Sequence, residues 1–236
     1  MRNKNLVFTS AGDNTNFYKY WLNKERKYDL MVVYYGNKKN KYKEFCEHYF
    51  MRKGSKFQNF YYIFKNYKYL LDRYEAFFIL DDDIIIKTVD INNLFKFLKK
   101  YKLWIISPTY DRKSKISHIF TMQYKKSFLR YCNFIELGIP LFSKYAIYKF
   151  MNIYDPSLVG FGIDYLYIWA LGQNIEDKYA LCDQISCINP FKKIRSIDIL
   201  QSKKDRIKNW LEIKKKFNIK TYPHKAYKII YRKNIQ

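Results

Sequence analysis

Cysteine, long apolar runs and acidic side chains are all scarce in this chain of 236 residues. The four cysteines, Cys46, Cys132, Cys182 and Cys187, are too few and too irregularly spaced for a disulfide framework or a zinc site. No apolar run approaches the roughly 18 residues of a membrane span, and no segment of the secretory kind, charged and then apolar, opens the chain. We therefore expect a soluble protein that stays in the cytoplasm.

The shortage of acids leaves a formal net charge of +24, from 45 Lys and Arg against 21 Asp and Glu. Such an excess is typical of proteins that bind nucleic acid or an anionic membrane. Half of it, +12, lies in residues 191–236, where 15 Lys or Arg accompany three acids. We therefore predict one domain over residues 1–190 and a basic helical extension over residues 191–236.

Short apolar runs alternate with amphipathic segments along the chain, without an internal repeat, a Pro/Ser-rich linker or a heptad run. Their periods predict these elements: strands at 5–10, 29–35, 76–80 and 103–107, the last ending at Pro108, and helices at 57–71, 94–98 and 144–151. Strands that alternate with helices predict an α/β fold with a central, mostly parallel sheet.

Three consecutive carboxylates, Asp81, Asp82 and Asp83, follow the strand expected at 76–80. In a doubly wound sheet, ligands bind beyond the carboxyl ends of the strands. If the segment stays extended, Asp81 and Asp83 face one side and Asp82 the other. Two carboxylates in register suit Mg²⁺ or Mn²⁺, with phosphate oxygens and water completing the shell. The pattern leaves one alternative open, a solvated turn in which one Asp caps the next helix.

Four segments together resemble a known family: FFILDDDI, LWIISPTYDRKSKISH, NFIELGIPLFSKYAIYKF and VGFGIDYLYIWAL. In order and spacing they are similar to a glycosyltransferase family of the GT-A, Rossmann-like fold that is long catalogued as a domain of unknown function. They also resemble the rhamnosyltransferase-like domain of a large algal virus protein. The resemblance covers most of residues 5–190.

The resemblance implies a hexosyltransferase-like enzyme of the Leloir type, which moves a sugar from a nucleotide diphosphate to a glycan or lipid-linked glycan. A UDP-sugar is the commonest donor in the resembling proteins, and polysaccharide biosynthesis is the implied setting. Asp81-x-Asp83 becomes the DxD motif for Mn²⁺ or Mg²⁺, with Asp83 as the principal metal ligand and Asp81 as a second one. Asp82 is counted with the nucleotide-binding residues.

The third metal ligand departs from the family pattern. Relatives show an Asp followed six residues later by a His, whereas here Asp183 is followed by Asn189. An amide oxygen ligates a hard cation without supplying charge, so we expect weaker metal binding through Asn189 or a ligand from elsewhere. Of the histidines, His118 matches a family histidine near the site, while His48 and His224 have no such match.

The turn after the first strand, with Thr9, Ser10, Gly12 and Asp13, resembles the nucleotide-binding turn of the family. Gly12 would allow a ring or a phosphate to approach the backbone closely. Lys56 resembles a lysine at the nucleotide site, where a flexible cation balances the charge of the diphosphate. Both features have an ordinary alternative, a strand-to-helix turn and a solvated surface lysine.

Glu136 and Asp164 are the candidate catalytic carboxylates. Glu136 stands between Ile135 and Leu137, an apolar setting in which an unpaired carboxylate is unfavourable. Asp164 follows a glycine-containing loop in the first turn of a predicted helix, where the helix dipole favours an anion. Helix capping is the alternative for Asp164. The match to the family motif G-x-G-x-D implies a functional role: if the reaction inverts the anomeric centre, Asp164 is the general base that takes the proton of the acceptor hydroxyl, and if it retains, Asp164 orients the acceptor. The sequence does not decide between the two.

The basic extension contains a capping-box pattern at Ser202 and Asp205 and one apolar stripe on a lysine-covered helix. The stripe consists of Ile207, Trp210, Leu211 and Phe217. It either packs on the domain or lies at an anionic membrane, which would place the protein at the inner face of the membrane.

Two other function classes remain open. A basic nucleic-acid-binding protein or metal-dependent nuclease would use the charge and the 25 tyrosines for stacking, but no nucleic-acid-binding motif occurs and we expect no nucleic-acid partner. A glycan-binding relative without catalysis would be consistent with Asn189 at the position of the metal-binding His.

Overall fold

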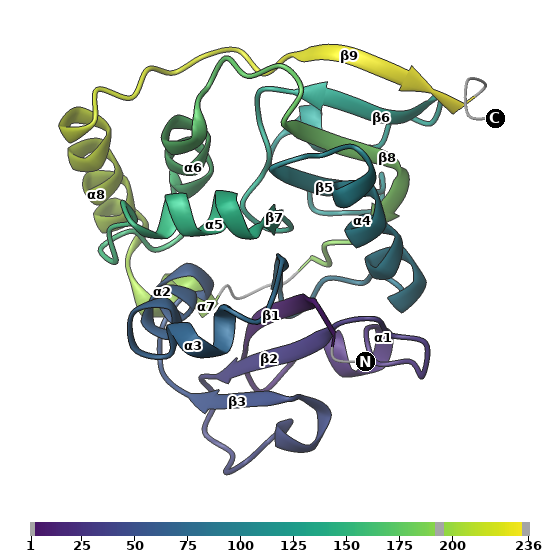
Figure 1. Cartoon of the computed structure of the whole chain (residues 1–236). Helices are drawn as coiled ribbons and strands as arrows, with labels where there is room; N and C mark the ends of the chain where they lie inside the picture. The colour runs from purple at the N-terminus through teal and green to yellow at the C-terminus, as the bar shows by residue number, and fades with distance from the viewer. Residues whose placement is uncertain (1–2, 192–195, 233–236) are drawn as a thin grey trace.

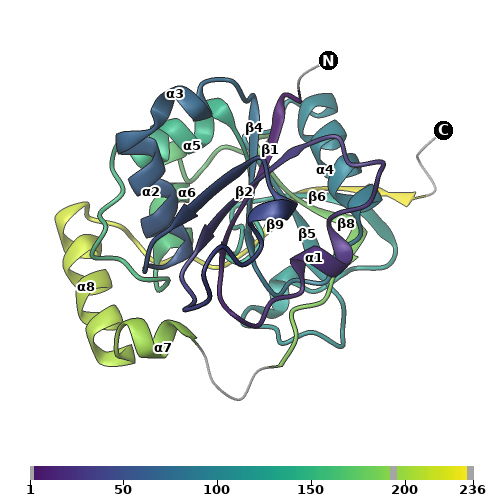
Figure 2. The same ribbon diagram turned by 90° about the horizontal axis from the view of Figure 1, so that it is seen from below.

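The computed structural model describes residues 3–191 and 196–232 of the chain. They form a nine-stranded sheet in the order β3-β2-β1-β4-β7-β5-β8-β6-β9, with helices on both faces (Figures 1 and 2). All strands except β6 and β7 run in one direction. The prediction of an α/β fold with a mostly parallel sheet is confirmed.

The N-terminal half of the sheet is wholly parallel, with β1 in the middle and β4 leading to the other half. Its strands are β1 (Asn5–Ala11), β2 (Asp29–Tyr34), β3 (His48–Met51) and β4 (Ala76–Asp81). The strands predicted near 5–10, 29–35 and 76–80 are therefore confirmed to within one residue at each end. Their parallel order brings the carboxyl ends of β1, β2 and β4 to the same edge.

The C-terminal half of the sheet contains both parallel and antiparallel strand pairs. It consists of β5 (Ile105–Tyr110), β6 (Ser127–Cys132), β7 (Leu141–Ser143), β8 (Tyr179–Cys187) and β9 (Ala226–Tyr231). β7 lies antiparallel between β4 and β5, and β9 is the edge strand beside β6. The sequence predicted only helix after residue 190, so β9 was not foreseen.

The strand expected to stop at Pro108 instead continues through it to Tyr110. Pro108 pairs with Cys182 of β8, and the register shifts directly after it. On the other side of β5, β7 pairs with Ile105 and Ile106 alone. Proline is tolerated here because a bulge follows it and one side of the strand has already lost its partner.

Side chains of successive strand residues enter two different cores, one on each face of the sheet. Leu6 and Phe8 join the core under α2, α5 and α6, whereas Val7 joins the core under α1 and α4. The helices are α1 (Phe17–Tyr20), α2 (Lys56–Asn66), α3 (Lys68–Leu71), α4 (Thr88–Lys100), α5 (Lys144–Met151), α6 (Ile163–Leu171), α7 (Ser196–Leu200) and α8 (Lys203–Lys216). The single helix predicted over 57–71 is therefore two helices, which meet at Tyr67.

The basic C-terminal segment packs on the rest of the fold. Trp210 and Ile213 of α8 lie in the same core as α5 and α6, and Phe217 contacts Trp169. Ser202 caps α8 by accepting from the Asp205 N–H, as its pattern predicted. The predicted stripe is nevertheless split, because Leu211 is 56% exposed while Trp210 is buried. The domain boundary at residue 190 stays a prediction.

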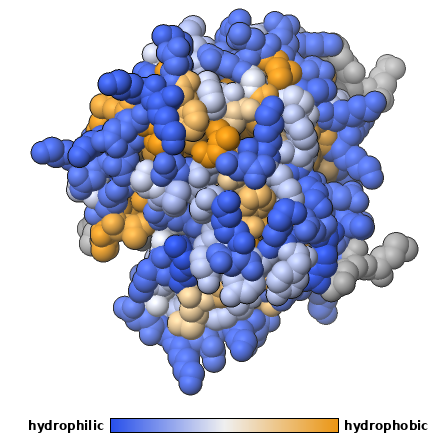
Figure 3. All heavy atoms as spheres, turned by 60° about the vertical axis from the view of Figure 1, so that its left-hand side comes forward, coloured by the Kyte–Doolittle hydropathy of each residue, from blue (hydrophilic) through white to orange (hydrophobic). Residues whose placement is uncertain are grey.

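None of the helices in the described ranges is long and apolar enough to cross a membrane. On the face that carries α7 and α8, separate apolar patches reach the surface between long hydrophilic side chains (Figure 3).

Candidate active site

The carboxylate triplet begins at the end of β4, as predicted, but it does not continue as an extended strand. Asp81 is the last residue of β4 and lies beside Ser10 of β1. The chain then turns, closed by a hydrogen bond from the Ile84 N–H to the Asp81 carbonyl at 3.2 Å. The expectation that Asp81 and Asp83 share one side of a strand is therefore wrong, since strand alternation ends at Asp81.

Asp82 connects the triplet to the turn that follows β1. Its carboxylate accepts the Gly12 N–H at 3.0 Å, and its carbonyl accepts the Asn16 N–H at 3.0 Å and the Thr15 hydroxyl. The side chain is only 7% exposed. Asp82 thus fixes the backbone of the first turn, whereas its predicted contact with a nucleotide stays a prediction.

A half-buried tyrosine, Tyr35, and a half-buried acid, Asp13, lie at the turn after β1. A Cβ atom on Gly12 would lie 2.8 Å from the ring of Tyr35, so a larger residue here would require that ring to move. Asp13 accepts from the Tyr34 hydroxyl at 2.5 Å, and this hydrogen bond is the main cause that lowers the pKa of Asp13. These side chains line the edge of the sheet at the ends of β1 and β2.

Thr9 and Ser10 at the end of β1 are both buried. Thr9 is fully buried, and its hydroxyl has no hydrogen-bond partner. Ser10 accepts from the side chain of Asn59 at 2.9 Å. Their assignment to nucleotide binding stays a prediction, which the burial of Thr9 does not favour.

Lys56 is buried and its ammonium group is held in place, so the alternative of a solvated surface lysine is wrong, while its role at a nucleotide site stays a prediction. Its ammonium lies 2.9 Å from Asp81 Oδ1 and donates to the carbonyls of Ile79, Leu137 and Gly138 at 2.9 to 3.1 Å. Burial lowers the pKa of Lys56, and the nearby Asp81 opposes that shift. Lys56 therefore joins the end of β4 to the loop that precedes β7.

That loop, Glu136–Pro140, lies directly against the end of β4. The Asp81 N–H donates to the Gly138 carbonyl at 3.1 Å. A Cβ atom on Gly138 would lie 2.6 Å from the Tyr110 hydroxyl and 3.3 Å from Asp81 Oδ2. Glycine at position 138 therefore lets Asp81 and Tyr110 approach each other from β4 and β5. Sequence reasoning missed Tyr110, because nothing near it in the chain marks it.

Glu136 is buried at the start of the same loop, with a side chain that accepts from the Thr121 hydroxyl at 3.0 Å. Burial raises the pKa of Glu136 to about 7, and the negative charges of Asp164 and Asp81 add to the rise. Glu136 is thus close enough to both acids to feel their charge. A carboxyl group with this pKa exchanges a proton near neutral pH.

Asp164 stands in the first turn of α6, as its loop predicted. Gly162 precedes that helix with a φ of +79°, a conformation that favours glycine. The Asp164 carboxylate is 5% exposed and accepts the Tyr165 N–H at 3.0 Å. Burial raises the pKa of Asp164 to about 7, and backbone hydrogen bonds limit the rise. Asp164 and Glu136 form a pair of buried carboxyl groups with similar pKa values.

Aromatic rings and two histidines lie beside this pair. His224 stacks on Phe134 with ring centres 3.7 Å apart, and its Nε2 lies 3.0 Å from the Tyr165 hydroxyl. His118 contacts both Phe134 and His224. The match of His118 to a histidine near the site is consistent with this position, while His224 was missed because it arrives from the distant segment before β9.

Asp183 and Asn189 interact with different parts of the fold. Asp183 is fully buried and forms a bidentate ion pair with Arg130. The Arg130 Nε donates to Oδ2 at 2.7 Å and Nη2 donates to Oδ1 at 3.0 Å. Asn189 is bound to the loop after β5, since its side-chain nitrogen donates to the Lys115 carbonyl at 3.1 Å. Asp183 therefore serves the packing of β8 on β6, and Asn189 as a metal ligand stays a prediction.

The side chains that could hold a divalent metal lie at the end of β4. Within the described residues, no group of three or more His, Cys, Asp or Glu could hold a metal ion. Asp81 and Asp83 offer the oxygen donors that Mg²⁺ and Mn²⁺ prefer, and the Asp81 side chain is 42% exposed although one oxygen pairs with Lys56. A metal site formed by this pair stays a prediction.

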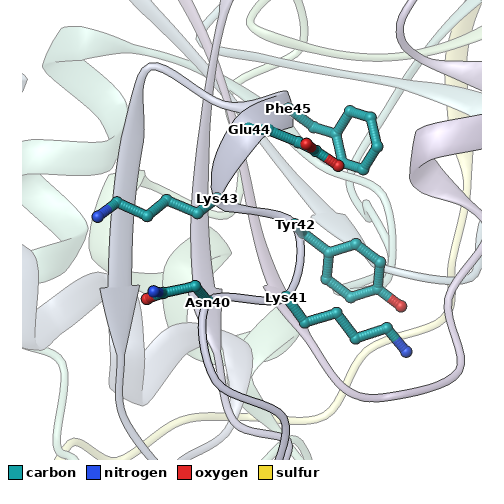
Figure 4. Close-up of a pocket in the computed structure, with 6 residues that line it drawn as sticks. All are labelled: Asn40, Lys41, Tyr42, Lys43, Glu44 and Phe45. Atoms are coloured by element: carbon teal, nitrogen blue, oxygen red, sulfur yellow. The ribbon is translucent and has the colours of Figure 1, made fainter.

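A shallow hollow of about 570 Å³ lies next to the turn after β1, along residues 40–45 (Figure 4). Lys41 and Tyr42 point to the same side of this segment (Figure 4). The Tyr42 hydroxyl donates to the Asp13 carbonyl at 3.0 Å. The hollow therefore borders the predicted nucleotide turn, although no predicted site residue lines it.

No protein-family model matches the chain, and no curated protein matches it. Solved structures do resemble it. GalNAc-T7, solved with UDP, GalNAc and Mn²⁺, gives a TM-score of 0.62 at 12% identity over 91% of this chain and 50% of that chain. S. aureus TarS 1-349 gives 0.53 at 11% identity, over 78% and 59%. Its complex with UDP-GlcNAc gives 0.53 at 10% identity, over 83% and 60%.

These neighbours are GT-A glycosyltransferases, and the chain shares their GT-A fold. The chain spans between half and 60% of the length of these structures. At such low identity the likeness establishes the fold alone. The resemblance to the family catalogued as a domain of unknown function, and to the algal virus protein, stays a prediction.

Proposed function

We propose that this protein is a metal-dependent glycosyltransferase that moves a sugar from a nucleotide diphosphate, with a UDP-sugar as the donor, to a glycan or lipid-linked glycan. One observation carries the proposal. At one edge of a GT-A sheet, the buried carboxyl group of Glu136 lies close enough to the partly exposed carboxylate of Asp81 and to the buried Asp164 to feel the charge of both. The complexes of the neighbours with UDP, UDP-GlcNAc and Mn²⁺ support this choice of donor and metal.

The donor would bind across the ends of β1, β2 and β4. Gly12 and Asp13 border the place for the nucleoside, and Asp81 and Asp83 would hold the metal against the diphosphate. When bound, Mn²⁺ or Mg²⁺ supplies charge neutralisation on the departing diphosphate. Lys56 supports this arrangement by holding Asp81 and the loop of Gly138 in one place.

The acceptor would bind on the side of Glu136 and Asp164. A pKa of about 7 suits a group that takes a proton from an acceptor hydroxyl at neutral pH. Asp164 is our choice for this general base, with Glu136 beside it to adjust its charge. The rings of Phe134, Tyr165 and His224 offer apolar surface next to these acids, of the kind on which a sugar ring packs.

A glycan-binding protein without catalysis is the second candidate, favoured by the lack of a three-residue metal cluster in the described ranges. Donor turnover separates the two. A nucleic-acid-binding role has less support, because tyrosines such as Tyr28, Tyr110 and Tyr167 are fully buried in the core and cannot stack on bases.

The test is a calorimetric titration of UDP into wild type and Asp83→Ala, with Mn²⁺ and again with EDTA. GDP and a short single-stranded DNA serve as control ligands. We expect UDP binding that requires both Mn²⁺ and Asp83. Binding of DNA regardless of metal, without binding of either nucleotide, would refute the proposal. UDP binding followed by no release of sugar from any UDP-sugar would favour the second candidate.

A further inference from the structure

The outer side of α7 and α8 exposes apolar side chains that the fold leaves without cover. Ile199 is 80% exposed, Leu211 56% and Leu200 42%, and Phe161, in the loop before α6, is 48% exposed. We call these four residues, together with Ile207, Lys204, Lys208 and Lys215, the α7–α8 face. It belongs to the side of the molecule seen in Figure 3.

On α8 this face is a shallow hollow of about 430 Å³. Its apolar part is Ile207 and Leu211, one helical turn apart, and its rim consists of Lys204, Lys208 and Lys215 with Glu212. A helix surface with exposed Ile and Leu between lysines is amphipathic in the manner of helices that lie at a bilayer interface.

The opposite side of α8 fixes the helix on the domain. Trp210 packs directly on Gly162, where a Cβ atom would clash with the indole ring, and Ile213 is buried beside it. Ile197 of α7 packs on Gly160 in the same way, at 2.6 Å from a Cβ placed there. The aromatic residues of the predicted stripe therefore hold the helix in place, and the α7–α8 face points away from the core.

The charge of the two helices has the sign that an anionic surface attracts. Residues 196–216 contain seven Lys or Arg and three acids, and one of the basic residues, Arg206, is buried in an ion pair with Asp198. The exposed excess is therefore lysine. Lysine stems cover apolar surface while their ammonium groups stay in water, as at a membrane interface.

We propose that the α7–α8 face is a docking surface for an anionic lipid bilayer. A bilayer offers negative headgroups to Lys204, Lys208 and Lys215 and an apolar interior to Ile199 and Leu211, which nucleic acid does not. The hollow on α8 is shallow and open, so it does not make the closed pocket that an anchor residue of a protein partner fills. This docking does not depend on the transfer reaction.

A consequence for the acceptor does rest on the proposed function. Trp210 contacts Gly162, two residues before Asp164, so the helix that would lie on the bilayer packs on the loop that leads to the proposed base. A membrane bound at the α7–α8 face would thus lie on the acceptor side of the site. This arrangement favours a lipid-linked acceptor over a free glycan.

The experiment is co-sedimentation of the full chain with vesicles of phosphatidylcholine alone, and with vesicles that also contain phosphatidylglycerol. We expect binding to the anionic vesicles only, which added salt weakens. Lys204→Gln/Lys208→Gln/Lys215→Gln should lower the partitioning roughly a hundredfold, from the contribution of each lysine near an anionic surface. Ile199→Ser/Leu211→Ser should lower it about tenfold or more, since apolar area no longer leaves water.

Matched controls come from α4, on the far side of the molecule (Figures 1 and 2). Lys96→Gln/Lys99→Gln/Lys100→Gln removes the same charge from exposed positions, and Val89→Ser removes an exposed apolar side chain. Equal loss of binding in the α4 lysine variant would overturn the proposal, because net charge alone would then explain it. Unchanged binding of the Ile199/Leu211 variant, or no binding to anionic vesicles, would overturn it as well.

Two further measurements distinguish lipid binding from dimerisation and from the proposed transfer activity. Sedimentation equilibrium of wild type and Leu211→Ser tests whether the face joins two copies of the chain, and a dimer that Leu211→Ser dissociates would overturn the lipid assignment. The far-UV circular dichroism and the thermal unfolding midpoint of each variant should match wild type, which shows that the variant is folded, and UDP titration of wild type is a separate measurement. Failure of UDP binding in wild type would count against the glycosyltransferase and leave the lipid result intact.

Discussion

The carboxylates at the end of β4 and those beyond it differ in what surrounds them. Asp81 is 42% exposed and faces the ammonium of Lys56, whereas Glu136 and Asp164 are buried and have pKa values raised to about 7. An ion pair and solvent favour a charged carboxylate, while burial favours a protonated one. Under the proposed function, the carboxylate at the end of β4 would serve the metal and the phosphates, and the buried carboxyl groups would serve proton transfer.

The difference in burial between these acids follows from the different architecture of the two halves of the sheet. The parallel half brings the ends of β1, β2 and β4 to one edge of the sheet, where the Asp81 side chain stays in contact with water. The mixed half covers its acids with α6, the loop before β7 and the aromatic residues Phe134 and His224. Differing environments that push carboxyl pKa values apart are a common way to separate two roles in one site.

Asp164→Asn is the most direct test of whether the buried carboxyl groups and Asp81 have different roles. If Asp164 is the general base, transfer should fall about a thousandfold while UDP binding stays at the wild-type level. Asp81→Asn should instead weaken both. The measurements are kcat with the turned-over UDP-sugar and the calorimetric affinity for UDP. Asp177→Asn, on an exposed loop, is the matched control, and unimpaired transfer by Asp164→Asn would end the assignment.

The raised pKa of Glu136 predicts a pH dependence of stability. Its ordinary value is 4.5 and its value in the fold about 7, so between these the folded state holds a proton that the unfolded state has released. The free energy of unfolding of wild type should therefore fall, relative to Glu136→Gln, by about 3 kcal/mol as pH rises through this window, and then level off. Urea unfolding of both proteins from about pH 4 to about pH 8 measures it. A constant difference would show that Glu136 is not buried in this manner.

Lys56→Met probes the connection between the two sides. The change leaves three carbonyls and Asp81 without their shared donor, so the free energy of unfolding should fall by about 3 kcal/mol. Lys65→Met, at an exposed position of the same helix, should change it by less than about 0.5 kcal/mol. Denaturant unfolding of both variants compares them, and equal small effects would mean that Lys56 is not needed to hold the loop.

Gly162→Ala tests how tightly α8 packs on the loop before α6. The new Cβ would meet the Trp210 ring and require a positive φ, so a loss of about 2 kcal/mol is expected. If the clash with Trp210 is the cause, Trp210→Ala should reduce the cost of Gly162→Ala in a double-mutant cycle. Additive losses in thermal unfolding would assign the cost to the backbone conformation instead.

Local pattern was enough for several elements of this molecule. The triplet Asp81–Asp83 was expected at the end of a strand, Asp164 in a first helical turn and Ser202 at a helix cap, and each is found there. These features depend on neighbours within a few residues, because alternation, glycine and capping act along the chain. The ligands and partners assigned to them remain for the experiments above.

Other features depend on residues far apart in the chain. The sequence did not predict β9, the passage of β5 through Pro108, or the stacking of His224 on Phe134. Lys56 had the pattern of a surface lysine, yet 81 residues separate it from Leu137, whose carbonyl it binds. Periodicity carries no information on such pairs, since they form only when the strands and helices are assembled.

The sequence by itself determined the α/β class, the strand that ends in carboxylates and the basic C-terminal segment, because composition and periodicity are properties of short stretches. Only the tertiary structure decided which acids are exposed and which are buried. It also decided that Trp210 faces the core while Leu211 faces solvent. Burial is the sum of contacts from many segments, and it sets both the pKa of a carboxyl group and the surface that a helix offers to a membrane.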